Sequence, residues 1–240
     1  MIHLTLVIEL WDVLGELIKG RNLSFFYCCV IIDLGDRMIP KRIIYCWFGG
    51  KEKPETVQNC IKTWKEQMPE YEYLEINESN FDINYNQYVK DAYDNRMWAF
   101  VSDVARLWAL YEYGGVYMDT DVVVYQPLDK FLKHDFFTGF EQQHYPVTAT
   151  IGACKNNELI KEMLDVYESK TFEKRNNWWE YETNTMIMSD VIGKYFDRDR
   201  MEYQEKDNMA IYPRQTFCNS EEINENVYTK HLMLGNWGEK

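Results

Sequence analysis

The sequence lacks several features that would place it in common functional classes. None of its six cysteines lies at the two-residue spacing of a zinc knuckle or redox motif, so we expect reduced, mostly buried thiols. The longest strongly apolar run, Phe25 to Ile32, falls far short of the ~20 residues that cross a bilayer as a helix. The first residues also lack the basic start of a secretory signal. We therefore expect a cytoplasmic protein.

Positive charge is scarce as well. The chain has 26 Lys and Arg against 39 Asp and Glu, which gives a net charge of -13. Long-range repulsion of this size makes nucleic acid an unlikely partner and argues against docking on anionic lipid through a polybasic patch. A local patch could still contact the inner face of a membrane, so peripheral association stays open. A small anionic substrate would need a cation to help hold it.

The hydrophobic pattern predicts an α/β fold. Residues 1–37 form an N-terminal extension of unclear role, and residues 38–240 form one domain without internal repeats or linkers. Strands and amphipathic helices alternate at the start of that domain, which is typical of parallel pairing. The predicted strands are 42–48, 71–76 and 116–118, the predicted helices 57–68, 97–113, 159–167 and 185–195, and the later extended segments 209–213 and 227–234.

Asp119, Thr120 and Asp121 follow the predicted strand 116–118. In an extended segment the two carboxylates point to the same side and can reach one centre. Hard oxygen donors at a strand end suit Mg²⁺ or Mn²⁺, and a diphosphate is a natural further ligand of such an ion. Apolar residues on both sides indicate that the acids interrupt a single buried strand, and buried carboxylates require a cation or a basic partner. The sequence therefore predicts a metal site.

Two neighbouring segments strengthen this prediction. Asp103 and Arg106 are three residues apart in a largely apolar helix, so we expect them to pair and to face a polar cavity. Trp47 precedes Gly49 at the end of the first predicted strand, on the same sheet edge as Asp119. A glycine there lets a ligand approach the backbone, although Trp47 is equally well explained as a core anchor.

Read together, these segments resemble the bacterial glycosyltransferases of family 32, the capsular-polysaccharide type with a DXD sugar-binding region. The large clostridial glucosylating toxins are similar at a greater distance. The resemblance implies a GT-A fold, a Rossmann-like single domain with a central mixed sheet. The blocks that carry it are 39–41 with 47–50, 99–107 and 110–121.

The resemblance also implies roles in binding the donor. Trp47 would stack on the nucleotide base, with Gly49 beside it. Asp103 and Arg106 would hold sugar hydroxyls and phosphate, and Tyr117 would line the donor pocket.

The remaining positions concern the metal and the diphosphate. Asp119 would contact the ribose and the metal side of the site, and Asp121 would bind the metal directly. His231, Asn236 and Trp237 match a C-terminal element that folds over the diphosphate, with His231 and Asn236 as further metal ligands. By themselves these three residues would have no assigned role.

The chain departs from the family at two positions. Ile44 stands where the family usually has His, and Asn236 stands where it usually has Ser. An amide oxygen can still reach a metal ion or its water. We expect the activity to persist, with an altered metal preference or altered closure over the donor.

The predicted function is a hexosyltransferase. The resemblance implies that a sugar moves from a nucleotide-diphosphate-sugar, UDP- or GDP-linked, to a glycan or lipid-linked glycan acceptor. Mn²⁺ or Mg²⁺ would assist, the anomeric configuration would be retained, and Asp119, Asp121 and Arg106 would be catalytic. The process would be capsule, exopolysaccharide or lipopolysaccharide synthesis.

Two alternatives stay open. The first is a phosphatase of the haloacid dehalogenase type, which also carries Asp-x-Asp after an apolar strand. The second is a sugar-nucleotide-binding protein without catalysis. An acceptor would lie against loops 140–150 and 172–186, whose Tyr145, Trp178, Trp179 and Tyr181 either pack on a glycan or belong to the core.

Overall fold

The computed structural model describes residues 38–177 and 180–235. They belong to one compact unit, residues 37–240. The predicted extension 1–37 lies outside the described residues. Within the described ranges no helix is long and apolar enough to cross a membrane. The four cysteines in these ranges are buried, as predicted.

The first half of the domain confirms the predicted alternation of strands and helices. Strands β1, β2 and β3 pair in parallel, with β1 between the other two. One short helix that the pattern did not predict, α4, precedes the long helix α5. The elements are β1 (Arg42–Cys46), α3 (Glu55–Gln67), β2 (Glu72–Ile76), α4 (Gln87–Asp94), α5 (Trp98–Tyr113) and β3 (Gly115–Met118).

Helix α5 ends where its glycine predicts. Gly114 has φ 64°, in the left-handed region, and its N–H donates to the carbonyl of Leu110 at 2.9 Å. A Cβ at this position would lie 2.7 Å from the backbone nitrogen of Lys155, so only glycine fits. The chain then turns directly into β3, which places the helix beside the strand that leads to Asp119.

The second half completes a mixed sheet, as predicted. The strand order is β2-β1-β3-β7-β5-β9-β8, with β6 paired to β5. Strand β7 is antiparallel to both β3 and β5, so β3 and β5 run in the same direction. Parallel pairing of β5 with β9 and antiparallel pairing of β9 with β8 complete the order. These strands are β5 (Phe136–Gln142), β6 (Tyr145–Pro146), β7 (Thr150–Ala153), β8 (Gln204–Lys206) and β9 (Met209–Tyr212).

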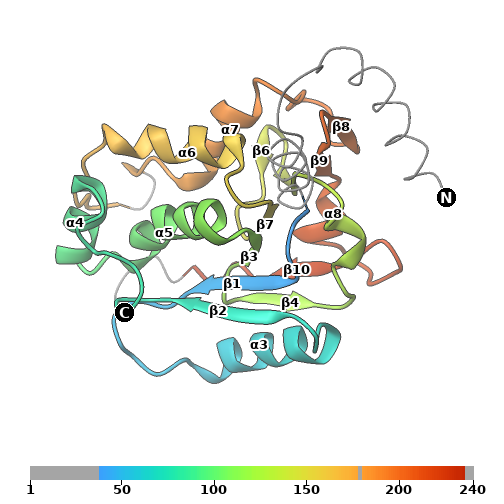
Figure 1. The fold of residues 1–240 in the computed structure, drawn as a ribbon, viewed down its shortest axis with the longest axis horizontal. Coiled ribbons are helices and arrows are strands. Elements are labelled where there is room, and N and C mark those ends of the chain that lie inside the picture. Colours follow the sequence, from blue (N-terminus) through green and yellow to red (C-terminus); the bar gives the residue numbers. More distant parts are fainter. Residues whose placement is uncertain (1–37, 178–179, 236–240) are drawn as a thin grey trace, which may run out of the picture. The chain divides into compact units, whose positions relative to one another are not determined.

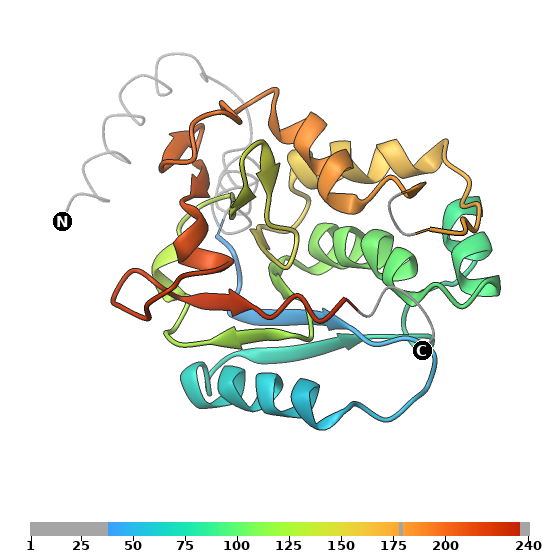
Figure 2. The ribbon, with the colours of Figure 1, turned by 180° about the vertical axis from the view of Figure 1, so that it is seen from behind.

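Helices cover both faces of this sheet. Both views show α3 on one side of β1 and β2 and α4 to α7 on the other (Figures 1 and 2). Side chains alternate accordingly: Ile44 packs into the core under α4 to α7, and Ile43 packs into the core under α3 with Trp64. The remaining helices are η1 (Asp129–Phe131), α6 (Glu158–Glu168), α7 (Asn184–Ile192) and α8 (Arg214–Phe217).

A second sheet of two strands joins distant parts of the chain. Strand β4 (Val122–Val124) pairs antiparallel with β10 (Thr229–His231), with His231 opposite Val122. The buried indole of Trp64 in α3 donates a hydrogen bond to the carbonyl of Val122 at 2.6 Å. Helix α3 therefore supports the strand that follows Asp121.

We predict that Trp64→Phe lowers the free energy of unfolding by about 1–3 kcal/mol, because the buried carbonyl of Val122 loses its donor. Urea denaturation would measure this change. Trp47→Phe is the matched control, since the Trp47 indole donates to the carbonyl of Lys51 in an exposed loop. Equal losses in the two variants would contradict the support assigned to Trp64.

Candidate functional site

Asp119 and Asp121 lie in a turn. The N–H of Val122 donates to the carbonyl of Asp119 at 3.1 Å, which closes the turn between β3 and β4. The prediction that the acids interrupt one extended strand is therefore wrong, because β3 and β4 belong to different sheets. The carboxylates converge through this turn rather than through alternation along a strand.

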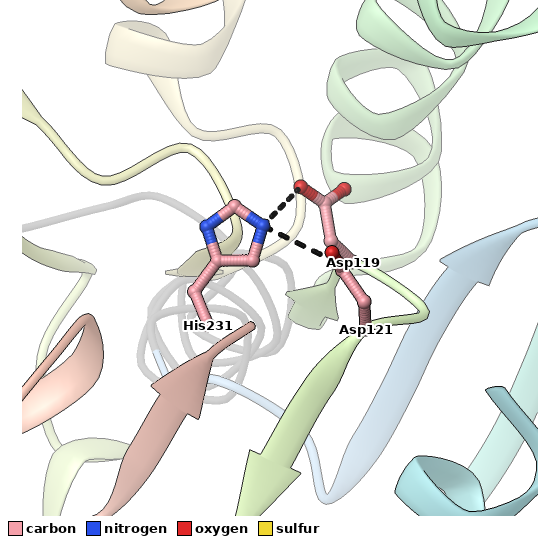
Figure 3. A group of neighbouring side chains, drawn as sticks. All are labelled: Asp119, Asp121 and His231. Atoms are coloured by element: carbon pink, nitrogen blue, oxygen red, sulfur yellow. Dashed lines mark ion pairs between the residues drawn. The ribbon is translucent and has the colours of Figure 1, made fainter. Parts of the chain in front are cut away.

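Strand β10 brings His231 to the turn. Besides its pairing with β4, the N–H of Leu232 donates to the carbonyl of Asp121 at 3.0 Å. The Nε2 atom of His231 lies 3.2 Å from Oδ1 of Asp121 and 4.0 Å from Oδ2 of Asp119 (Figure 3). Residues more than a hundred positions apart therefore form one cluster.

The cluster fits a divalent cation. One ligand atom from each of Asp119, Asp121 and His231 lies within 4.8 Å of the others. Carboxylate oxygens with an imidazole nitrogen suit Mn²⁺ and tolerate Mg²⁺. Although burial opposes it, the hydrogen bond with Asp121 and the nearby carboxylates raise the pKa of His231. Despite burial, the same contact and the N–H of Leu234 lower the pKa of Asp121. A proton on His231 thus supplies positive charge that a bound cation would replace.

Arg106 ties this cluster to helix α5. Its side chain is 6% exposed and pairs with Asp103 at 3.0 Å, as predicted, and also with Asp119 at 3.2 Å. Although burial opposes it, the charge of Asp119 raises the pKa of Arg106 above its ordinary value. The guanidinium also donates hydrogen bonds to the carbonyls of Ser102 and Thr148 and to Ser102 Oγ, while Oδ1 of Asp103 and Oδ1 of Asp119 lie at ion-pair distance from it.

Asp103 retains one free acceptor in a buried position. It is 1% exposed, and its Oδ2 atom has no hydrogen-bond partner among the described residues. Burial raises its pKa, and Arg106 only partly opposes this. Asn184, which the sequence did not single out, lies beside it: its amide nitrogen is 3.4 Å from the carbonyl of Asp103, and its Oδ1 atom is also unpaired within the described ranges. These two oxygens can accept hydrogen bonds from a bound hydroxyl or water.

Tyr117 orients Asp119 from the end of β3. Its hydroxyl donates to Oδ1 of Asp119 at 2.7 Å, and the guanidinium of Arg106 lies 4.6 Å from its ring centroid. Burial raises the pKa of Tyr117 well above its ordinary value, so the hydroxyl stays protonated and remains a donor. The carboxylate of Asp119 is therefore held from two sides.

Trp47 and Gly49 follow β1 on the same sheet edge as Asp119. The Trp47 ring is partly exposed, and Nζ of Lys53 lies 5.5 Å from its centroid. Gly49 has φ 88°, and an added Cβ would lie 2.7 Å from the Trp98 ring. The positive φ and the close approach of Trp98 are enough to explain why residue 49 is a glycine, so its presence does not require a ligand. Its N–H donates to Glu78 at 2.7 Å.

The remaining predicted residues differ in outcome. Asn236, Trp237, Trp178 and Trp179 lie outside the described residues. The Tyr181 ring stacks on Phe172 at 5.6 Å between centroids and 7° between planes, so it is a packing residue.

Glu141, at the end of β5, was not predicted as a site residue. Its carboxylate lies close enough to Asp119 for the two charges to repel each other. A lone Glu in an apolar strand gives no sequence signal of such a neighbour.

Comparison with known proteins agrees with this geometry. Residues 54–138 match the family described as "Glycosyltransferase sugar-binding region containing DXD motif". That segment runs from the start of α3 into β5 and contains Asp103, Arg106, Asp119 and Asp121. No curated protein matches the sequence. The matched region supports a glycosyltransferase and leaves the assignment to family 32 as a resemblance.

Solved structures agree on the fold. A structure described as "PaToxG Glycosyltransferase" is 18% identical, with a TM-score of 0.50 over 66% of this chain and 69% of that one. A glycosyltransferase involved in the glycosylation of the major capsid of PBCV-1 is 12% identical, with a TM-score of 0.43 over 81% and 94% of the two chains. The mixed sheet, its helical layers and the likeness to the first of these structures support a GT-A fold. Residues 54–138 match a DXD-containing sugar-binding region.

The fold argues against the phosphatase alternative. Haloacid dehalogenase phosphatases carry their acidic motif on the first strand, with the first Asp as a free nucleophile. Here Asp119 follows β3, and its Oδ1 atom is engaged by Tyr117 and Arg106. A carboxylate held in this way is suited to binding rather than attack.

We predict that Arg106→Met lowers the free energy of unfolding by about 3–5 kcal/mol, because Asp103 is left buried and unpaired. Chemical denaturation at neutral pH would measure it. Arg198→Met is the control, since Arg198 pairs with Asp190 on the surface and its loss should cost less than ~1 kcal/mol. Similar stability of the two variants would refute the role of the buried pair.

Proposed function

We propose that the chain is a retaining, metal-dependent glycosyltransferase that moves a hexose from a nucleotide-diphosphate-sugar to a glycan acceptor. The observation that carries the proposal is the convergence of Asp119, Asp121 and His231 within 4.8 Å at the end of β3. The match of residues 54–138 to a DXD sugar-binding region supports it independently. Metal dependence, retention and donor class go beyond that match.

Asp119, Asp121 and His231 would hold Mn²⁺ or Mg²⁺, with Asn236 as a further ligand. When bound, the ion neutralises the charge that develops on the departing diphosphate. Arg106 would keep Asp119 and Asp103 fixed, because its buried guanidinium pairs with both carboxylates and donates a hydrogen bond to the carbonyl of Thr148. In this arrangement Arg106 contributes by positioning and by its local positive potential.

The donor would lie along the edge formed by β1 and β3. Trp47 would stack on the nucleotide base, with Gly49 next to it and Trp237 closing over the diphosphate. Tyr117 would line the donor pocket on the side formed by β3. The buried, unpaired Oδ2 of Asp103 would accept a hydrogen bond from a sugar hydroxyl, which explains why an acceptor without a partner is kept there.

No enzyme nucleophile is assigned. The acceptor hydroxyl would attack the anomeric carbon on the face from which the diphosphate departs, so the configuration is retained. Positioning and electrostatic stabilisation then account for the rate.

The biological setting follows from the resemblance alone. We place the reaction in capsule, exopolysaccharide or lipopolysaccharide synthesis, in the cytoplasm or at the inner face of the membrane, with a UDP- or GDP-sugar donor and a glycan or lipid-linked acceptor. Residues 38–240 would form the catalytic domain, and residues 1–37 would be an N-terminal extension to which we assign no role.

A panel of UDP- and GDP-sugars tests the proposal directly. One donor should raise the Tm only when Mn²⁺ is present, because a ligand at 100 times its Kd stabilises a protein by about 2.7 kcal/mol. The same donor should release nucleoside diphosphate slowly in water. Binding without turnover across the panel would favour the alternative of a catalytically inactive sugar-nucleotide-binding protein.

We predict that Asp121→Ala removes the Mn²⁺-dependent rise in Tm and reduces donor hydrolysis at least about 100-fold, while the protein stays folded by circular dichroism. Asp94→Ala is the matched control, because Asp94 pairs with Lys90 on the surface of α4. A folded Asp121→Ala protein with near wild-type activity would rule out the metal site.

We also predict that Tyr117→Phe weakens Mn²⁺ binding about 10-fold, because Asp119 loses the hydroxyl that orients it. Isothermal titration calorimetry would report the change. Tyr45→Phe removes a comparable bond, from Tyr45 to Glu75 at 2.9 Å on the neighbouring strand, and should leave Mn²⁺ affinity unchanged. Unchanged affinity in Tyr117→Phe would show that Arg106 alone orients Asp119.

A further inference from the structure

The second nitrogen of the His231 ring has no assigned partner. Nε2 faces Asp119 and Asp121, whereas Nδ1 is buried and has no hydrogen-bond partner in the described part of the chain (Figure 3). A buried polar group left unpaired costs about 1–3 kcal/mol. Imidazoles that bind metals through one nitrogen almost always donate the other N–H to a carboxylate, carbonyl or water. Such a partner should lie near Nδ1.

Glu141 is a carboxylate for which the described residues provide no hydrogen-bond donor. It lies at the end of β5, is partly buried, and accepts no hydrogen bond from any group in residues 38–177 or 180–235. Its charge contributes to the raised pKa of His231, together with those of Asp119 and Asp121. Those two carboxylates occupy the Nε2 side of the ring. Of these three carboxylates, Glu141 is therefore the one that can accept a hydrogen bond from Nδ1–H.

The fold brings the two residues to one place. Strand β5 runs in the same direction as β3, on the other side of β7, so Glu141 near the end of β5 and Asp119 after β3 lie at the same sheet edge. Helix α8 borders both partners. Gly139 lies against Phe217 of α8, and the N–H of His231 donates to the carbonyl of Cys218 directly after that helix, at 2.8 Å.

A local irregularity also occurs at Glu141. The register between β5 and β6 shifts between Phe140 and Gln142, so Glu141 stands opposite no single partner residue. Bulges of this kind re-aim a side chain and occur frequently beside functional sites. The irregularity gives the Glu141 carboxylate freedom to turn out of the regular alternation of the strand.

We propose that Glu141 is the positioning residue of His231: its carboxylate accepts a hydrogen bond from Nδ1–H while Nε2 binds the divalent cation. This inference rests on the proposed metal site. The bond would fix the orientation and tautomer of the ring and increase the basicity of Nε2. Glu141 would not contact the cation itself.

Mn²⁺ alone, titrated into the full-length chain and followed by electron paramagnetic resonance of the free ion, tests the inference. Glu141→Ala should weaken Mn²⁺ binding about 10- to 100-fold, and Glu141→Gln, which keeps an acceptor without the charge, should lose less. Glu112→Ala, on the exposed face of α5, changes the net charge equally and should bind as the wild type does.

A double-mutant cycle with His231→Ala identifies the route of the effect. If Glu141 acts through His231, Glu141→Ala causes no further loss once His231 is absent. An equal loss in both backgrounds would show that Glu141 acts directly on the cation and would overturn the inference. Wild-type affinity in Glu141→Ala would overturn it too, with the metal site intact. Failure of the wild-type chain to bind Mn²⁺ would overturn both the metal site and this inference.

A spectroscopic readout does not depend on affinity. With Mg²⁺ bound, the His231 Nδ1–H proton should give a downfield, slowly exchanging imidazole resonance in ¹⁵N-histidine-labelled protein. The resonance should be absent in Glu141→Ala and retained in Glu112→Ala. Its presence in Glu141→Ala would show that another group accepts the bond, against the inference.

Discussion

The buried guanidinium of Arg106 is the interaction on which the site depends. It binds three segments at once: helix α5 through Asp103, the turn after β3 through Asp119, and the segment before β7 through the carbonyl of Thr148. A charge buried to this extent is tolerated only when its partners are in place, because an uncompensated ion costs several kcal/mol. The requirement therefore holds the three segments in one geometry, and the acidic turn is positioned before any ligand arrives.

Charge balance around Arg106 favours a cation at the proposed metal site. Among the described residues, the four carboxylates of Asp103, Asp119, Asp121 and Glu141 lie near the guanidinium of Arg106, the imidazole of His231 and, at Glu141, the charge of Arg214. Within a chain of net charge -13, such a cluster repels a diphosphate. A proton on His231 would relieve the repulsion only in part. A divalent ion at the proposed site would both satisfy the cluster and attract an anionic donor.

Local pattern predicted the parts of the fold that local forces determine. Helix α5 and strand β3 are visible from apolar periodicity and from the glycine at 114, and the parallel order of the first three strands follows from their alternation with helices. The turn at Asp119 was predicted as part of one strand. The apolar residues before and after it give the same sequence pattern whether they belong to one sheet or, as here, to two different sheets. The family resemblance implied that His231 is a metal ligand. Its approach to Asp121 depends on the pairing of β4 with β10, which no local pattern encodes.

Because of that long-range pairing, Asp121 contributes both to the proposed metal site and to the hydrogen bonds that hold the segment after β10. Its side chain faces His231, its carbonyl accepts the N–H of Leu232, and its Oδ2 atom accepts the N–H of Leu234 at 3.0 Å. A shift of β10 would therefore move a carboxylate of the proposed metal site and withdraw the imidazole at the same time. Conversely, an ion held by Asp121 and His231 would cross-link the turn before β4 to β10 through their side chains, adding to the two-stranded ladder. Ion binding would thus be coupled to the position of residues 231–234, because the same backbone segment carries both sets of contacts.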